Sequence, residues 1–346
     1  MPIKLARPDL FHPKIVLAGC PKLIEGDGDD AGLVPALAKR GLFANWLSWD
    51  DPETLTADLV ILRATWDYIE RLDEFLAWSK KVRNLLNSPA VVAWNTDKHY
   101  LHDLAVAGVP VLESEFFEPG QDVHLPAGEV VVKPAVGAGS VGAQRFTDHG
   151  KARHHAAVLQ EAGSAVLVQP YNPKVADGET AMVFLGGKAS HAFTKGPMLP
   201  EPGGKQVFDA SGTYATEDLS PADPEPEYWD VGYAALTAAA EHLDMAPTEL
   251  LYARVDVIGG HEGPQLLELE LVEPGLGWGQ LDVSTRELQQ RQFALEVESA
   301  LDRLGLDRPH LRCPPHGSAR RRPPRQPPAL DGRAAARGLL RPRAAA

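Results

Sequence analysis

The stretch EVVVKPAVGAGSVGAQRF, residues 129–146, contains the features on which the interpretation of the fold depends. It opens with the apolar run 129–133, which is typical of a β-strand, and closes with a short strand-like piece, 143–146. Between them, residues 137–142 match the pattern Gly-x-Gly-x-x-Gly. We therefore expect a strand, a flexible loop and a returning strand, a form in which backbone N–H groups can reach phosphate oxygens.

The same sequence pattern also occurs in dinucleotide-binding turns. There the last glycine leads directly into a helix whose N-terminus binds the pyrophosphate. Here the next helical pattern begins only near Lys151, and the motif lies near the middle of the chain. The sequence therefore favours a loop over phosphates, with Lys133 as a fixed cation. A dinucleotide-dependent oxidoreductase and a glycine-rich hairpin without a ligand remain as alternatives.

Charged side chains mark two later strands. Arg254 and Asp256 belong to one predicted strand, and Glu268 and Glu270 to the next. Because strand side chains alternate, each of these two pairs shares one face. Pairing across the glycine-containing turn predicts Asp256 opposite Glu268 and Arg254 opposite Glu270.

Carboxylates crowded on one face repel one another unless positive charge lies between them. Mg²⁺ prefers oxygen ligands and bridges carboxylates to phosphates. We therefore predict a metal site at Asp256, Glu268 and Glu270. A solvated strand face with one salt bridge is the alternative, and Glu273 is a second candidate for the place of Glu270.

The patterns divide the chain into four predicted segments. Residues 1–93 alternate strands and helices, which indicates a parallel sheet. Residues 94–167 contain the glycine loop, and residues 168–306 contain the predicted metal strands. Residues 307–346 are rich in Pro, Arg and Ala and are predicted to be disordered, either as a basic arm or as the product of a non-native reading frame.

Three finer expectations follow from local patterns. Residues 73–86 are predicted to be helical, and Gly186-Gly187 is expected to join a hairpin. Residues 198–228, rich in Pro, Gly, Asp and Glu, are expected to form a long loop.

Charge and composition narrow the class of protein. The net charge is −13, and the segment from Leu311 onward carries +8, which leaves −21 for the rest. A body this acidic does not favour nucleic-acid binding. No apolar run long enough for a membrane span and no secretory signal are evident. Two distant cysteines fit a reducing cytoplasm, and Cys20 is either a buried residue or a nucleophile.

In their order and spacing, these motifs resemble the ATP-grasp superfamily, on the branch of D-alanine–D-alanine ligase and glutathione synthetase. The resemblance covers roughly residues 14–305. The matching stretches are Asn95–Lys98, Val131–Pro134, Gly137–Gly142, Val168–Tyr171, Asp177–Glu179, Arg254–Asp256 and Glu268–Glu270. It implies an α/β (mixed α+β) protein with a Rossmann-like pre-ATP-grasp domain, followed by two α+β subdomains that clamp ATP.

The resemblance also implies roles for single residues. The ATP contacts would be Lys98, Lys133, Gly137, Gly139, Ser140, Gly142, Gln169, Pro170, Tyr171 and Glu179. Lys195 and Arg254 would be catalytic, because they would neutralise the γ-phosphate and the developing acyl phosphate. Asp256, Glu268 and Glu270 would bind two Mg²⁺ ions, which Mn²⁺ could replace. The family more often has Glu-x-Asn where this chain has Glu268-Leu-Glu270.

The segments Arg63–Tyr68 and Trp94–Leu101 are similar to a less-studied ATP-grasp group that includes the enzyme closing the D-cycloserine ring. Arg63 or Asp67 would then bind a substrate carboxylate or amine, because open α/β sheets bind ligands at strand carboxyl ends. A helix N-cap at Thr65 or Asp67 is the alternative.

The implied activity is that of a Mg-ATP-dependent carboxylate–amine ligase. It would form an acyl phosphate on a small amino-acid-like substrate and then a C–N bond. The expected protein is cytoplasmic, binds neither nucleic acid nor membrane, and can form a homodimer, as the family often does. An ATP-binding regulatory module without ligation is the competing hypothesis.

Overall fold

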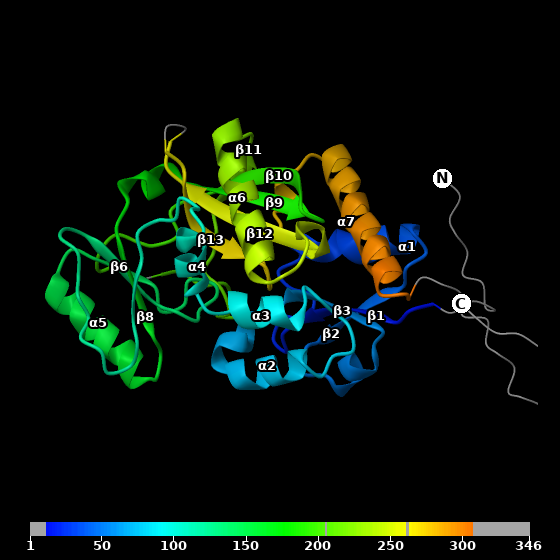
Figure 1. The fold of residues 1–346 in the computed structure, drawn as a ribbon, viewed down its shortest axis with the longest axis horizontal. Helices are drawn as coiled ribbons and strands as arrows, with labels where there is room; N and C mark the ends of the chain where they lie inside the picture. The colour runs from blue at the N-terminus through cyan, green and yellow to red at the C-terminus, as the bar shows by residue number, and fades with distance from the viewer. Residues whose placement is uncertain (1–11, 205, 261–262, 307–346) are drawn as a thin grey trace, which may run out of the picture. The chain divides into compact units, whose positions relative to one another are not determined.

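The computed structural model describes residues 12–204, 206–260 and 263–306, which form three β-sheets with helices on them (Figure 1). This mixture of parallel and antiparallel sheets confirms the predicted α/β class. The predictions for the tail, residues 307–346, lie outside the described residues. None of the described helices combines the length and the apolar character needed to span a membrane.

The first sheet is parallel, as predicted, with strand order β2-β1-β3-β4. Its strands are β1 (Ile15–Gly19), β2 (Ala44–Ser48), β3 (Leu59–Ala64) and β4 (Leu85–Leu86). Its helices are α1 (Leu33–Lys39) and α2 (Leu72–Ser79), followed by α3 (Pro89–Asn95) and α4 (Tyr100–Val106). All residues of β1 and β3 are buried, as expected for a parallel sheet covered on both faces.

The predicted helix over residues 73–86 is wrong in its second half. Helix α2 ends at Ser79, and the chain returns to the sheet as β4, where Leu85 and Leu86 pair with Val60 and Ile61. Burial of the two leucines beside β3 outweighs the helical periodicity.

The second sheet has the order β5-β8-β6-β7 and is antiparallel. Its strands are β5 (Glu115–Phe117), β6 (Val130–Pro134), β7 (Gln144–Phe146) and β8 (Val166–Pro170), and helix α5 (His149–Glu161) packs on it. The glycine loop joins the antiparallel pair β6 and β7. The predicted strand–loop–strand form is thereby confirmed, and the dinucleotide-binding turn, which needs a helix directly after Gly142, is wrong.

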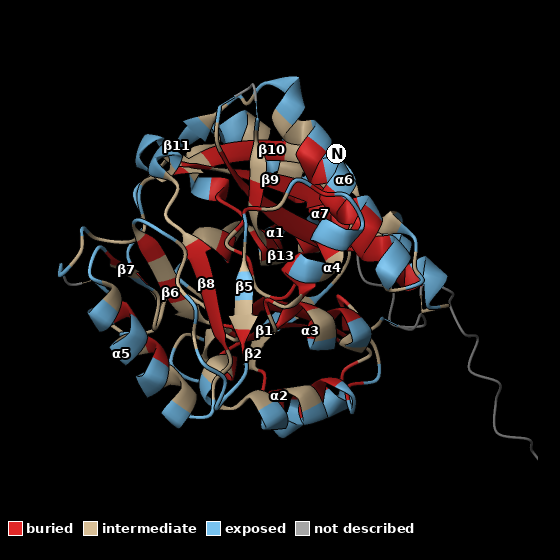
Figure 2. Cartoon of the chain, turned by 60° about the vertical axis from the view of Figure 1, so that its left-hand side comes forward, coloured by how far each residue is buried: buried red, intermediate tan, exposed pale blue. Residues whose placement is uncertain are grey.

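The third sheet has the order β11-β10-β9-β12-β13. Its strands are β9 (Glu179–Leu185), β10 (Lys188–Lys195), β11 (Leu219–Ala222), β12 (Tyr252–Ile258) and β13 (Gln265–Glu270); its helices are α6 (Pro226–His242) and α7 (Val283–Arg303). Short 3₁₀ helices occupy connections at Asp29–Gly32, Pro52–Thr56, Trp66–Glu70, Pro173–Asp177, Pro247–Glu249 and Trp278–Gln280. Strands β8 and β9 are largely buried (Figure 2).

Two predictions about this sheet have different outcomes. Leu185 pairs with Lys188 across Gly186-Gly187, which confirms the hairpin. The predicted loop over residues 198–228 contains β11, which pairs with β10. Pro221 interrupts the strand pattern in the sequence, but β11 is at the edge of the sheet, where a missing N–H is tolerated.

The first and third sheets share one hydrophobic cluster. Ile15 and Ile61 of the first sheet pack in the same cluster as Val183 and Tyr252 of the third. The hydroxyl of Tyr252 also contacts the carbonyl oxygens of Leu62 and Val272. The second sheet has a core cluster of its own, formed by Phe117, Val130, Val132, Phe146, Ala152, Ala156, Val166 and Val168.

Asn87 is a fully buried connector between the first and third sheets. Its amide nitrogen donates to the carbonyl oxygens of Tyr252 and Leu271, and its Oδ1 accepts from the N–H of Leu251. Removal of this side chain would take a hydrogen-bond partner from buried backbone groups at the start of β12 and just after β13.

We expect Asn87→Ala to lower the free energy of unfolding by about 2–4 kcal/mol, because each orphaned buried group costs about 1–3 kcal/mol. Urea unfolding followed by circular dichroism measures this. Asn84→Ala is the matched control, since Asn84 is half-buried and makes one hydrogen bond, to the carbonyl of Asp58. Equal losses in the two variants would contradict the prediction.

Candidate functional site

One cavity is lined by residues from many separate segments, which we call the central cavity. Most of the residues predicted from the sequence line it. These are Lys98, Lys133, Gly137, Gly139, Ser140, Gln169, Pro170, Tyr171, Glu179, Lys195, Arg254, Glu268 and Glu270. Asp256 is fully buried beside them, and Gly142 lines a neighbouring groove with Arg145.

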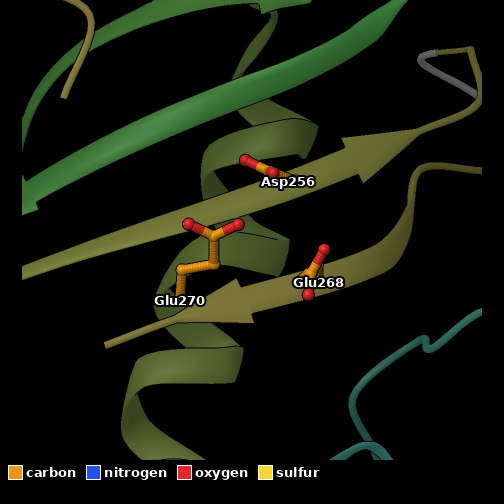
Figure 3. Close-up of side chains that lie close together, drawn as sticks. All are labelled: Asp256, Glu268 and Glu270. Carbon is orange, nitrogen blue, oxygen red and sulfur yellow. The ribbon is translucent and has the colours of Figure 1, made fainter. Parts of the chain in front are cut away.

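Three carboxylates converge on adjacent strands β12 and β13 (Figure 3). Asp256 pairs with Glu268 and Arg254 with Glu270, which confirms the predicted register. One oxygen from each of Asp256, Glu268 and Glu270 lies within 4.8 Å of the others. This all-oxygen donor set fits Mg²⁺, and Glu273 is not part of it.

Each carboxylate of this cluster already forms an ion pair with a lysine or arginine. Asp256 lies 2.5 Å from Lys195 Nζ and 2.9 Å from Arg254 Nε. Arg254 also reaches Glu270 at 2.6 Å, and Lys98 lies 2.9 Å from Glu268. The site is therefore a compensated network of charges, in which Asp256 and the cations are buried and Glu268 and Glu270 are half-buried.

The network changes the pKa values of its carboxyl groups. Burial raises the pKa of Asp256, but the charges of Arg254 and Lys195 outweigh it and lower the pKa below its usual range. At Glu268, burial is likewise outweighed by Lys98 and Lys133. Burial dominates at Glu270 and raises its pKa. Asp256 and Glu268 are accordingly the constant anions of the cluster.

Lys133 differs from the other cavity cations. Among the residues that the structure describes, it has no ion-pair partner, and burial lowers its pKa. Lys195, in contrast, is shared between Asp256 and Glu179, the latter at 3.0 Å. Lys133 is thus the cation that can bind an incoming phosphate without giving up a protein partner.

The glycine loop packs against a second loop around Tyr214. The N–H of Ala215 donates to the carbonyl of Gly139 at 3.2 Å, and the Trp66 and Tyr214 rings lie 5.1 Å apart. Gly139 has φ of +57°, and a Cβ there would come within 3.0 Å of the Tyr214 backbone. A glycine is favoured at this position because both the backbone conformation and the close approach disfavour a side chain.

The segment Gln169–Tyr171 at the end of β8 is held from both sides. Gln169 Nε2 donates to Ser114 Oγ at 2.9 Å. The guanidinium of Arg145 lies 3.6 Å from the centre of the Tyr171 ring and also pairs with Glu129. This segment therefore presents a fixed surface to the cavity.

The structure does not bring Arg63 and Asp67 to the central cavity. Arg63 is buried and donates to Asp30 and to the carbonyl of Pro274. Asp67 accepts from Trp49 Nε1 at 2.7 Å. The pleat of β3 and the turn after it direct both side chains into the protein, so this geometry gives a substrate role no support.

Sequence reasoning missed Asp27, Trp66, Tyr68, Tyr214 and Glu217, which also line the central cavity. The only sequence signal for Trp66 and Tyr68 was their place beside Asp67. Tyr214 and Glu217 fell in a stretch that was treated as one long loop. Cys20 lies at the end of β1, where burial raises its thiol pKa, and this favours a structural role.

The ion pairs of the carboxylate cluster predict how its affinity for a divalent ion depends on nucleotide. An ion that binds alone must displace Lys98, Lys195 or Arg254, whereas an ion that arrives with a nucleotide offers these cations phosphate oxygens as new partners. We expect Mn²⁺, titrated by electron paramagnetic resonance, to bind about tenfold or more tightly in the presence of ADP, by linkage. Lys98→Met, which frees Glu268, should strengthen Mn²⁺ binding without nucleotide. Equal affinities with and without ADP would rule out this coupling.

The family model described as the N-terminal domain of D-cycloserine synthetase DcsG matches residues 15–87. The cycloserine biosynthesis protein DcsG of Streptomyces lavendulae is 35% identical over 270 residues, which are 72% of this chain and 88% of that protein.

Solved structures show the same relationship. The crystal structure of D-cycloserine synthetase DcsG has a TM-score of 0.72 and 31% identity, and the match covers 83% of this chain and 99% of that one. D-alanine–D-alanine ligase from Bacillus anthracis, complexed with ATP, has a TM-score of 0.58 and 14% identity, and that match covers 84% and 98% of the two chains.

Proposed function

Since this chain belongs to the family of the cycloserine biosynthesis protein DcsG, within the ATP-grasp superfamily, and is an ATP-dependent ligase, we propose that it joins a carboxylate to an amine through an acyl phosphate in the central cavity. The observation that carries this proposal is the convergence of Lys98, Lys133, Lys195 and Arg254 on the carboxylate cluster. Such a set of fixed charges suits the transfer of a phosphoryl group to a carboxylate.

In the proposed first step, an oxygen of the substrate carboxylate attacks the γ-phosphorus of ATP. The new O–P bond gives an acyl phosphate, and the bond to the β-phosphate oxygen breaks to release ADP. Lys133 and Lys98 bind phosphate oxygens, while Lys195 and Arg254 neutralise the charge that develops. The cluster Asp256, Glu268 and Glu270 would hold two Mg²⁺ ions, or Mn²⁺ in their place, which screen the phosphates when bound.

In the second step, the amine nitrogen attacks the acyl carbon. The C–N bond forms, phosphate leaves, and the nitrogen loses a proton. Arg254 is fixed for charge neutralisation, because it is bound to Asp256, Glu270 and the carbonyl of Gly275. The reaction depends mainly on the alignment of reactants and needs no nucleophile from the protein.

At the nucleotide end, we propose that Gln169–Tyr171 contacts the adenine, Glu179 the ribose, and residues 137–142 the phosphates. We also propose that the chain is divided into the four segments predicted from the sequence, that the protein is cytoplasmic and that it forms a homodimer. The relatives are named for the synthesis of cycloserine, and this name suggests an amino acid that can close such a ring as the substrate. Opening the amide bond of a cycloserine ring gives O-amino-serine, which carries both the carboxylate and the attacking nitrogen.

The test measures phosphate release from Mg-ATP by the purified protein with D- and L-amino acids, dipeptides and O-amino-serine. Glu268→Gln, which removes one charge of the cluster and keeps its shape, is the control. Release that increases with one substrate class and collapses in Glu268→Gln supports the proposal. ATP binding without stimulated release would favour a regulatory module instead.

A further inference from the structure

Glu273 is held in the wall of the central cavity by its own backbone. Its carbonyl accepts from Trp66 Nε1 at 3.1 Å. The next two carbonyls, those of Pro274 and Gly275, accept from Arg63 at 2.8 Å and from Arg254 at 3.1 Å. Three consecutive carbonyl groups are thus fixed, and the side chain of Glu273 is presented from a rigid segment.

The carboxylate of Glu273 lacks the lysine or arginine partner that three other carboxylates of the cavity have. Glu268, Glu270 and Glu179 each form an ion pair with a lysine or arginine. Within the described residues, Glu273 has no ion pair and shares a side-chain hydrogen bond with Tyr68. Burial raises its pKa to about 7. Glu273 is half-buried, and a partly desolvated carboxylate without a cationic partner is stabilised when a cation binds beside it.

The surroundings of Glu273 suit a small organic cation. Trp66, Tyr68 and Tyr214 line the cavity together with it, and their ring faces attract positive charge. The acid Asp27 lines the cavity as well. Among the protein cations, Lys98 lowers the pKa of Glu273 most, but Lys98 already forms an ion pair with Glu268.

We propose that Glu273 binds the ammonium group of the amino-acid substrate, and that it thereby selects amino acids over hydroxy acids of the same shape. This inference rests on the proposed ligase function and extends it to the group that the site recognises. The role is distinct from metal binding, because Glu273 lies outside the cluster of Asp256, Glu268 and Glu270.

The experiment compares Glu273→Gln with the parent protein, using the full chain and phosphate release from Mg-ATP. The probes are alanine, serine and O-amino-serine, each as both enantiomers, beside lactate and glycerate as hydroxy acids. In the parent, the stimulating amino acid should exceed its hydroxy counterpart by about tenfold or more, as expected for a charge-assisted contact. In Glu273→Gln, the KM for the amino acid should rise about tenfold or more while the KM for ATP changes less than about twofold.

Two further variants keep the result interpretable. Glu273→Asp, which retains the charge, should recover part of the preference for amino acids. Glu217→Gln removes an exposed acid from the same cavity and should change this preference by less than about threefold, since exposed charges contribute little. Thermal unfolding of each variant checks that the fold is retained.

Each outcome decides the proposal. Equal stimulation by amino and hydroxy acids in the parent would overturn it, and so would an unchanged preference in Glu273→Gln. If Glu217→Gln loses the preference instead, the ammonium is bound elsewhere. If no probe raises phosphate release although Mg-ATP binds, the ligation proposed above fails, and the inference that depends on it fails with it.

Discussion

An Asp256→Asn variant is expected to lose activity and about 3–5 kcal/mol of the free energy of unfolding, the cost typical of breaking a buried charge network. Asp256 is fully buried and accepts hydrogen bonds from Lys195 and from two nitrogens of Arg254. The neutral amide keeps the shape of the side chain, but it removes the negative charge that Asp256 places beside the buried cations Lys195 and Arg254. Because Asp256 is also a proposed metal ligand, phosphate release should fall to background.

The stability change is measured by urea unfolding of the parent and the variant. Asp50→Asn serves as the control, because Asp50 pairs with Arg71 near the surface, and such pairs contribute at most about 1 kcal/mol. A loss at Asp256 no larger than that at Asp50 would show that the buried network does not stabilise the fold.

A Lys133→Met variant is expected to lower kcat/KM for ATP by about 100-fold or more, the order observed when a group that stabilises developing charge is removed. Methionine preserves the length and packing of the side chain and removes its charge. Lys133 has no ion-pair partner among the described residues, so its loss should leave the stability nearly unchanged.

Kinetics with varied ATP and calorimetric titration with ADP measure the effect, with Lys151→Met as an exposed control on α5. A normal affinity for ADP in Lys133→Met would place the phosphates elsewhere in the cavity. A large loss of stability in this variant would contradict the view that Lys133 is uncompensated.

The strand that carries a functional residue could be predicted from the sequence better than the direction of its side chain. Alternation along the two strands predicted which side chains share a face, and the pairing of Asp256 with Glu268 expected across the glycine turn is the one that the structure has. The register then shifts between Asp256 and Val257, so that Leu266 pairs with Val257. Such a shift depends on packing against neighbouring elements, which one strand pattern does not contain.

Arg63 and Tyr214 show why one residue was assigned to the site without support and another was missed. Arg63 lies at the carboxyl end of a parallel strand, where ligands are common, but its partner Asp30 comes from another segment and holds it away from the cavity. Tyr214 reaches the cavity through contacts with Gly139 and Trp66, both distant in the chain. Contacts of this kind are set by tertiary structure and leave no local pattern.

The separate core of the second sheet has a consequence for the enzymatic cycle. The first and third sheets are joined by a common cluster and by the hydroxyl of Tyr252, so separating them would expose buried apolar surface and break internal hydrogen bonds. The second sheet encloses its own cluster, and within the described residues it adds one buried side chain, Leu167 of β8, to the cluster of the third sheet, with Phe116 of β5 packed beside it. A rotation of this sheet as a body would therefore leave its own cluster closed and disturb few apolar contacts. We therefore expect nucleotide entry and ADP departure to depend on a swing of β5–β8 with α5, and the frequency of that swing to limit turnover when product release is slow.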